Sequence, residues 1–346
     1  MVCLLLFGPA ALSTHAAFSA LYAFGDGVCT TTGTPAPPEL YYGDRYCNGR
    51  VWVEVLAQRQ GLTYDASKNL SYFGQYSPDL VSNVNKFSAP ANVNTSLFVV
   101  WVSDADFVWD LENIYPSLNL STWNNAISSS LANHLTAIQT LYAKGARTLI
   151  MPNAVDITEA PQYSNMSAGD KSFVLGRVAY FNFGFTTMLN QARTSLPGLT
   201  IYAPDFFTLL QRLVAQPGNY GFINATSDAI DDGYTDLSGA GANYLFWDYL
   251  DPTAKAHEVM ADTVQQIVSP VRIRDLTWLN GSNRLDLVNI PSGLNGFVEG
   301  RTNVVSGSWR SVTNFNSTSA TRPIFVSASG PRQTYRLRFP FAWSWP

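Results

Sequence analysis

The sequence predicts an α/β protein built on a doubly wound parallel sheet, followed by a small all-β module. Across residues 18–269, apolar β-rich runs alternate with stretches of helical periodicity. After Ser269-Pro270 only short β-rich runs remain, separated by Gly, Asn, Ser and Pro. Strands that lack polar alternation and are separated by helices are buried on both faces, which is typical of parallel sheets.

Each expected strand of the first part precedes a helical stretch. The strands are expected within 18–24, 95–102, 146–152 and 199–205, and the helices within 49–61, 123–145, 171–196, 206–216 and 252–268. In an open parallel sheet of this kind, ligands bind at the carboxyl ends of the strands. We therefore expect the site at the residues that follow these strands.

The C-terminal part, residues 270–346, has the pattern of a small β-sandwich. Its six β-rich runs lie within 271–279, 284–290, 296–304, 309–315, 322–328 and 334–341. The segment contains no His and no Cys. We expect this module to serve in binding or attachment and to take no part in catalysis.

Composition excludes several partners. The 346-residue chain has a net charge of −4 and only 13% charged residues, about half the usual share. Without a basic cluster, the protein is not expected to bind nucleic acid or anionic membranes. A neutral, hydrogen-bonding surface is common in secreted proteins that meet carbohydrate or other uncharged polymers.

The N-terminal residues 1–17 have the pattern of an export signal. Their apolar stretch is too short to span a bilayer, and Thr14-His15-Ala16 offers small residues for cleavage. The mature protein is then expected to be secreted or periplasmic, without an integral membrane segment. A buried first strand is the alternative for these residues.

Two cysteines remain if Cys3 leaves with the signal. An even number in an exported protein favours a Cys29–Cys47 disulfide, and two free buried thiols are the alternative.

Four sequence blocks indicate a family. "YAFGDG", "NLSYFGQYS", "WVSDADF" and "YLFWDYLDPTAKAH" resemble, in order and spacing, the blocks of the SGNH (GDSL) hydrolases, and the resemblance covers about residues 20–268. It implies a flavodoxin-like three-layer α/β sandwich and hydrolysis of acyl esters. It also implies a nucleophilic Ser in the first block, oxyanion donors from a Gly and an Asn, and an Asp-x-x-His pair in the last block.

Three of these positions carry a different residue here. The Ser position is Gly27, the Asn position is Ala105, and the His position is Asp251. The Gly of the second block is retained as Gly74, and the Asp of the last block as Asp248. Glycine has no hydroxyl to deprotonate, and an ionised Asp would repel a developing oxyanion. We therefore predict a catalytically inactive protein.

No other residue is an evident substitute. His134 lies on the apolar stripe of a helix and is expected in the core, and His257 lies on the helix that follows Asp251. Cys29 has no evident base.

We expect a ligand-binding cleft in place of the active site. Its predicted residues are Asp26, Gly27, Gly74, Asp104, Asp106, Asp248 and Asp251. The expected ligand is a carbohydrate or an acyl ester, with no cofactor and no metal. Three alternatives stay open: a Ca²⁺ or Mg²⁺ site at the carboxylates, a paired-carboxylate glycoside hydrolase, and an ester hydrolase with an unrecognised catalytic arrangement.

Overall fold

The central sheet is parallel, as predicted. The computed structural model describes residues 18–302, 308–316, 318–327, 333–339 and 343–345, so the expected export signal lies outside the described residues. The sheet has the order β1 (Leu21–Gly25), β2 (Leu97–Trp101), β3 (Thr148–Ile150) and β4 (Thr200–Tyr202). All three pairings are parallel. Its strands therefore all end at one edge, where the predicted site residues follow them.

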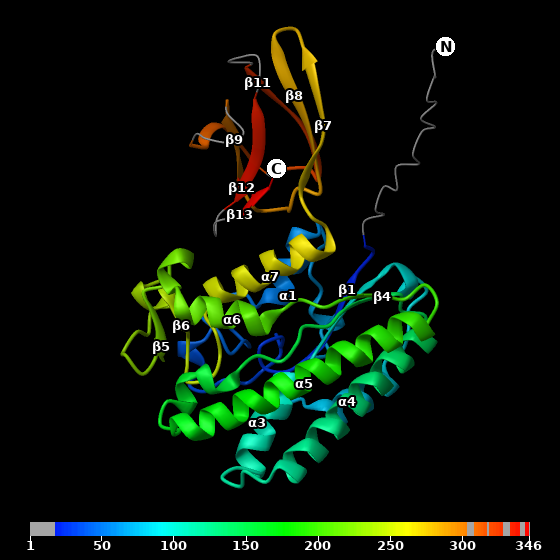
Figure 1. Cartoon of the computed structure of the whole chain (residues 1–346), viewed down its shortest axis with the longest axis vertical. Coiled ribbons are helices and arrows are strands. Elements are labelled where there is room, and N and C mark those ends of the chain that lie inside the picture. Colours follow the sequence, from blue (N-terminus) through cyan, green and yellow to red (C-terminus); the bar gives the residue numbers. More distant parts are fainter. Residues whose placement is uncertain (1–17, 303–307, 317, 328–332, 340–342, 346) are drawn as a thin grey trace, which may run out of the picture.

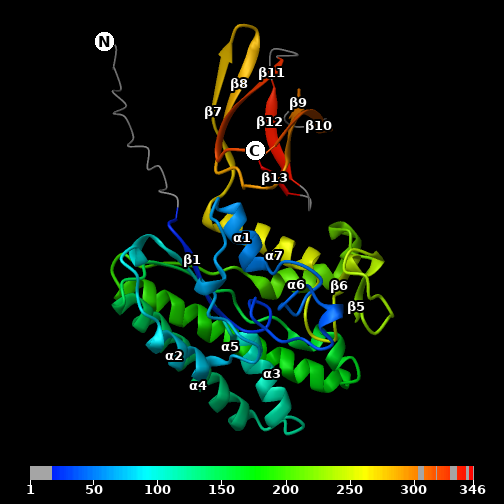
Figure 2. The same ribbon diagram turned by 180° about the vertical axis from the view of Figure 1, so that it is seen from behind.

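Helices cover both faces of this sheet (Figures 1 and 2). Helices α1 (Trp52–Arg59) and α7 (Ala254–Val268) pack together on one face, next to α6 (Phe206–Ala215). On the other face lie α2 (Ser77–Lys86), α4 (Leu120–Ala143) and α5 (Ala168–Ser195). Side chains of β1 alternate between the two cores, with Ala23 on the α1 side and Phe24 on the α2 side. The doubly wound α/β prediction is confirmed.

Two helices and a small sheet were not predicted. Helices α2 and α3 (Ser103–Asn113) are short, and α3 begins directly after β2. Strands β5 (Asn224–Asp228) and β6 (Tyr244–Phe246) form a separate parallel pair. Short 3₁₀ helices connect these elements, at Pro38–Leu40, Ala66–Lys68, Val93–Thr95, Ile157–Glu159, Pro161–Tyr163, Pro217–Tyr220 and Ala240–Asn243. Among the described residues, no helix combines the length and the apolar character that crossing a bilayer requires.

The C-terminal part is all-β, as predicted. One antiparallel sheet has the order β11 (Thr321–Ser327), β8 (Ser282–Val288), β7 (Arg272–Leu279). The other has the order β10 (Arg310–Phe315), β9 (Gly296–Arg301), β12 (Thr334–Phe339), β13 (Trp343–Trp345). Side chains of both sheets, among them Leu285 and Leu337, share one core, so the two sheets form a small sandwich.

A buried ion pair lies where the two parts of the chain meet. Arg59 Nε of α1 contacts Asp262 Oδ1 of α7 at 2.7 Å, and both side chains are almost fully buried. The backbone of Arg59 also accepts a hydrogen bond from Ser292 N at 3.1 Å, in the loop after β8. Arg59 thus links the two helices to the C-terminal sheets.

Removing the acidic partner should be costly. In Asp262→Ala the buried guanidinium loses its counter-charge, and we expect the free energy of unfolding to fall by about 3–5 kcal/mol. Asp275→Ala is the matched control, because its pair with Arg274 is exposed and should contribute less than about 1 kcal/mol. Urea unfolding of both variants measures the difference. Equal losses would contradict the role assigned to the buried pair.

Candidate functional site

The site begins at the tight turn that follows β1. The N–H groups of Cys29 and Thr30 both donate to the Asp26 carbonyl, at 3.1 Å each. The Asp26 carboxylate accepts from Val28 N at 3.1 Å, which closes the turn around its own side chain. Asp26 is therefore part of the backbone support of the turn.

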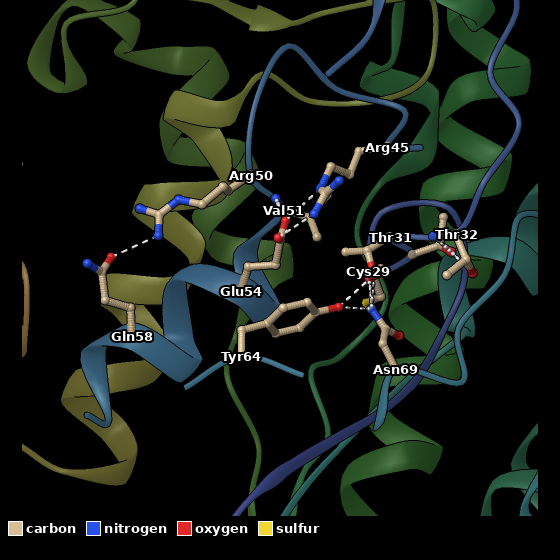
Figure 3. Close-up of polar contacts among 11 residues, drawn as sticks. Cys29, Thr31, Thr32, Arg45, Arg50, Val51, Glu54, Gln58, Tyr64 and Asn69 are labelled. Carbon is tan, nitrogen blue, oxygen red and sulfur yellow. Dashed lines mark hydrogen bonds and ion pairs between the residues drawn. The ribbon is translucent and has the colours of Figure 1, made fainter. Parts of the chain in front are cut away.

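Polar contacts behind the turn fix its position (Figure 3). The Asn69 amide donates to the Cys29 carbonyl at 2.8 Å and to Tyr64 Oη at 3.0 Å. Tyr64 Oη lies 2.6 Å from Thr31 Oγ1. These contacts join the turn to the segment after α1 and leave the opposite side of the turn free for the cavity.

The same figure shows how α1 is held at its start. Glu54 accepts from the Val51 N–H at 3.0 Å, which satisfies a free donor of the first helical turn. Arg45 forms a two-point contact with the same carboxylate, at 2.7 and 3.0 Å. The loop before α1 is therefore anchored to the helix beside the site.

Two glycines of the first block have different structural roles. A Cβ atom at Gly25 would lie 2.6 Å from Cys29 Sγ, a distance that the packing does not allow. A Cβ at Gly27 would lie 3.0 Å from the nearest atom of Phe73, a side chain that is half exposed, and 3.6 Å from Asp251 Oδ1. The backbone of Gly27 does not have a positive φ. Gly25 is required by the fold, whereas a serine would fit at position 27 if Phe73 moved slightly.

A cavity of about 220 Å³ opens at this turn. The predicted block positions Gly27, Gly74, Ala105 and Asp251 all line it. Asp26 and Asp104 line it as well. Most of the remaining lining is apolar, and it includes Trp101, Phe206, Leu209, Leu210, Phe246 and Met260. The structure thus brings the four sequence blocks together beside an apolar chamber.

Two of the seven predicted ligand-binding residues lie outside the lining of this cavity. Asp106 accepts from Ser77 N at 2.8 Å and from Ser130 Oγ at 2.6 Å. Asp248 accepts from the N–H groups of Leu250 and Asp251, at 2.9 and 2.7 Å, and from Tyr41 Oη at 2.9 Å. Their contacts hold neighbouring segments in place.

The carboxyl groups at the cavity are strongly desolvated. Burial raises the pKa of Asp26 to about 7, although the Val28 N–H opposes this shift. Burial also raises the pKa of Asp104 and of Asp251, and nearby carboxylates add to both shifts. A raised pKa favours the protonated carboxyl group, which cannot accept a proton until it ionises. Asp251 is thus poorly suited to replace a histidine.

The described acidic residues at the cavity are not arranged as the ligands of a metal ion. Among the described residues, no group of three or more His, Cys, Asp or Glu side chains is placed to hold a metal ion. Asp26 and Asp104 instead accept from different backbone N–H groups, Val28 N at 3.1 Å and Val155 N at 3.0 Å.

Both histidines of the described chain lie in the core. His134 Nδ1 donates to the Ser130 carbonyl at 2.8 Å, and its ring packs on Phe185. His257 Nδ1 accepts from Trp52 N at 3.2 Å, and burial lowers its pKa to about 3. Neither histidine lines the cavity, so neither can act as its base.

The predicted Cys29–Cys47 disulfide is wrong. Both cysteines are buried free thiols, which was the alternative. The Cys29 side chain packs over Gly25, and the Cys47 thiol donates to Asn48 Oδ1 at 3.7 Å, so each thiol is committed to other neighbours. Burial raises the pKa of both thiols, which also removes Cys29 as a nucleophile.

Sequence reasoning missed the apolar side of the site. Trp101 is the last residue of β2, and Phe206 begins α6. Both were assigned only to secondary structure, because an apolar side chain that lines a cavity has the same pattern as one in a core. The exposed aromatic residues Phe73 and Tyr249 carried a usable signal, since each lies inside a family block.

Comparison with known proteins identifies the class. Residues 21–264 match the GDSL-like lipase/acylhydrolase family, and this match covers more than half of the chain. The chain therefore belongs to the GDSL-like lipase/acylhydrolase family, as the sequence blocks predicted.

Individual relatives are distant. The thermolabile hemolysin of Vibrio parahaemolyticus is 22% identical over 251 residues, which cover 65% of this chain and 56% of that protein. One GDSL esterase/lipase of Arabidopsis thaliana is 23% identical over 239 residues, covering 65% and 64%. The chain thus spans less than two thirds of the length of these two relatives. A second Arabidopsis thaliana GDSL esterase/lipase is 24% identical, covering 70% of this chain and 78% of that protein.

Solved structures of lipases are similar in part. A lipase from a goat rumen metagenome covers 72% of this chain and 97% of its own, with a TM-score of 0.45 and 11% identity. A putative GDSL-like lipase from Parabacteroides merdae covers 72% and 94%, with a TM-score of 0.46 and 9% identity.

The raised pKa of Asp26 predicts that stability falls as the pH rises. Between about 3.9, the pKa expected in the unfolded chain, and about 7, the folded state keeps a proton that the unfolded state has released. The stabilisation is complete below pH 4 and is lost as the pH passes 7, by roughly 4 kcal/mol in total. Thermal unfolding from pH 4.5 to 8 should show this loss. Asp26→Asn, which keeps an acceptor for Val28 N, should show a flatter profile, and an unchanged profile would contradict the assignment.

Proposed function

We propose that this protein is an exported, non-hydrolytic member of the GDSL family whose former active-site cavity binds an acyl-ester ligand. One observation carries the proposal. Gly27 stands in the nucleophile position, and the group that faces it is the Asp251 carboxyl, 3.6 Å from where a side chain at position 27 would begin. This distance supports the assignment of the two positions to a catalytic pair that lacks both reactive groups.

The lining offers no substitute nucleophile and base. Among the described residues that line the cavity there is no Ser, Thr, Cys, His or Lys. The working-hydrolase alternative would need a carboxylate or Tyr249 to attack an ester directly. Burial and neighbouring charges raise the pKa of Tyr249, so its reactive phenolate form is disfavoured.

The cavity suits an acyl chain better than a sugar. A carbohydrate needs many hydrogen-bonding partners, whereas this lining is mostly apolar. Donors for one carbonyl oxygen remain, because the N–H groups of Gly27 and Gly74 donate to no described residue. Trp101 Nε1 is also buried without a partner. These donors could hold an ester carbonyl that the protein does not cleave.

The first test is direct assay of ester hydrolysis. We expect 4-nitrophenyl acetate and butyrate to be hydrolysed no faster than in buffer, because a base and a nucleophile are both missing. Asp251→Ala serves as the control for trace contaminants. Turnover that survives repurification and is abolished in Asp251→Ala would overturn the proposal.

The second test is restoration. In Gly27→Ser/Asp251→His, a hydroxyl and an imidazole should lie within hydrogen-bonding reach, with Asp248 beside the new ring. We expect measurable turnover in the double variant and almost none in either single variant, because the two groups act as a unit. Adding Ala105→Asn, which lines the same cavity, should raise the rate by on the order of 10²-fold.

Correctly folded variants that stay inactive would argue against these roles. Thermal unfolding and binding of a non-hydrolysable acyl analogue establish that the fold and the cavity are intact. If the triple variant binds the analogue and still shows no turnover, Gly27 and Asp251 do not occupy the nucleophile and base positions.

A further inference from the structure

Asp251 carries a buried carboxyl group without a protein partner. Its side chain is 4% exposed and lines the cavity beside Gly27. Its backbone is well anchored, since Asp251 N donates to Asp248 Oδ1 at 2.7 Å and its carbonyl accepts from Trp247 N at 2.8 Å. No described residue forms a hydrogen bond or an ion pair with its carboxyl oxygens. Buried polar groups are almost always paired with protein or ordered water, so this carboxyl group is available to a molecule that enters the cavity.

The cavity is lined by acidic side chains and by no basic ones among the described residues. The side chains that can carry charge near neutral pH are Asp26, Asp104, Glu112 and Asp251, and no Lys, Arg or His lies among the described residues that line the cavity. On ionisation these groups can only become negative, so the cavity can pair with a cation and offers an anion no counter-charge.

Aromatic side chains frame the same cavity. Phe73, Trp109 and Tyr249 line it and are 48%, 41% and 48% exposed. The faces of aromatic rings attract cations, most strongly where water is partly excluded. The aromatic side chains and Asp251 therefore favour the same kind of head group.

We propose that the cavity binds an amphiphile with a primary ammonium head group, which donates to the Asp251 carboxylate while its apolar chain lies along α6 and α7. This inference rests on the proposed function, since it assumes that the cavity takes an apolar chain. An ammonium group has three donors and no acceptor, which matches a carboxylate that receives no donor from the protein. The contact is a charge-assisted hydrogen bond inside an apolar wall.

Other cations and head groups fit less well. A metal ion needs several oxygen ligands around one point, and the described carboxylates are not grouped in that way. A carboxylate head group would face four acids without a counter-ion. A hydroxyl head group could make one hydrogen bond, but it would not use the charge of the cavity.

Binding should release a proton. Burial, together with the Asp248 and Asp26 carboxylates, raises the pKa of Asp251 and so favours its neutral form in the empty site. The ammonium group favours the ionised form, and the proton leaves to solvent as the ion pair forms. The titratable groups that surround Asp251 are Asp26, Asp248, Tyr41, Tyr249 and Cys47.

The test compares octylammonium with octan-1-ol and octanoate, which share one apolar chain and differ in the head group. Isothermal titration calorimetry at pH 6, in two buffers of different ionisation enthalpy, gives the affinity and the number of protons released. For the wild-type protein we expect octylammonium to bind on the order of 10- to 100-fold more tightly than octan-1-ol, with net release of protons. Octanoate should bind most weakly.

Two substitutions locate the effect. Asp251→Asn keeps the shape of the side chain and removes its charge, so it should abolish both the ammonium preference and the proton release while octan-1-ol binding stays within about threefold. Asp231→Asn is the matched control, because it removes an exposed negative charge that does not line the cavity. Its binding should equal that of the wild type.

The outcomes separate this inference from the proposed function. Suppose that octan-1-ol binds and that octylammonium binds no more tightly, or that octylammonium still binds more tightly than octan-1-ol to Asp251→Asn. In either case the proposed ammonium head group is wrong, and the apolar-chain site stands. If none of the octyl compounds binds to the folded wild-type protein, the apolar-chain site falls and this inference falls with it.

Discussion

The parallel pairing of β1 with β2 is the constraint on which the site depends. Its register places Gly25 opposite Trp101, so both strands end at the same level. The turn with Gly27 and the first turn of α3 with Ala105 must then emerge side by side. The loop of Asp248 and Asp251 follows β6 and reaches the same edge. Residues far apart in the sequence meet there because hydrogen bonds fix where the strands stop.

The buried acids near this edge differ in how far hydrogen bonds compensate for their desolvation. Asp106 and Asp248 each accept two or more hydrogen bonds, and those bonds fix the start of α2 and the loop before α7. The Asp251 carboxyl group accepts no hydrogen bond from a described residue, and the nearby Asp248 and Asp26 carboxylates raise its pKa. The first two acids contribute to the architecture, whereas an unpaired buried acid is destabilising in the free protein. Such a cost is more often found at functional sites than elsewhere.

Much of the fold and part of the site could be predicted from the sequence. The strands with continuous apolar runs and the long helices α4 and α5 were predicted because their patterns extend over many residues. Helix α3 was missed because its first turn overlaps a block that had been assigned to the end of a strand. The block positions Gly27, Gly74, Ala105 and Asp251 were predicted to converge, and they line one cavity. The apolar wall from α6 and the free thiols depend on side-chain packing that no local pattern records.

The conformation at Gly27 has a consequence for how proteins of this family are classified. Its φ angle is not positive, and a small side chain fits beside it if Phe73 moves slightly. The three replaced block positions, Gly27, Ala105 and Asp251, therefore differ in their side chains and do not require a different course of the chain. Groupings by shape or by family follow the course of the chain and do not record these side chains. Whether a member of such a family can catalyse depends on the chemistry at individual positions.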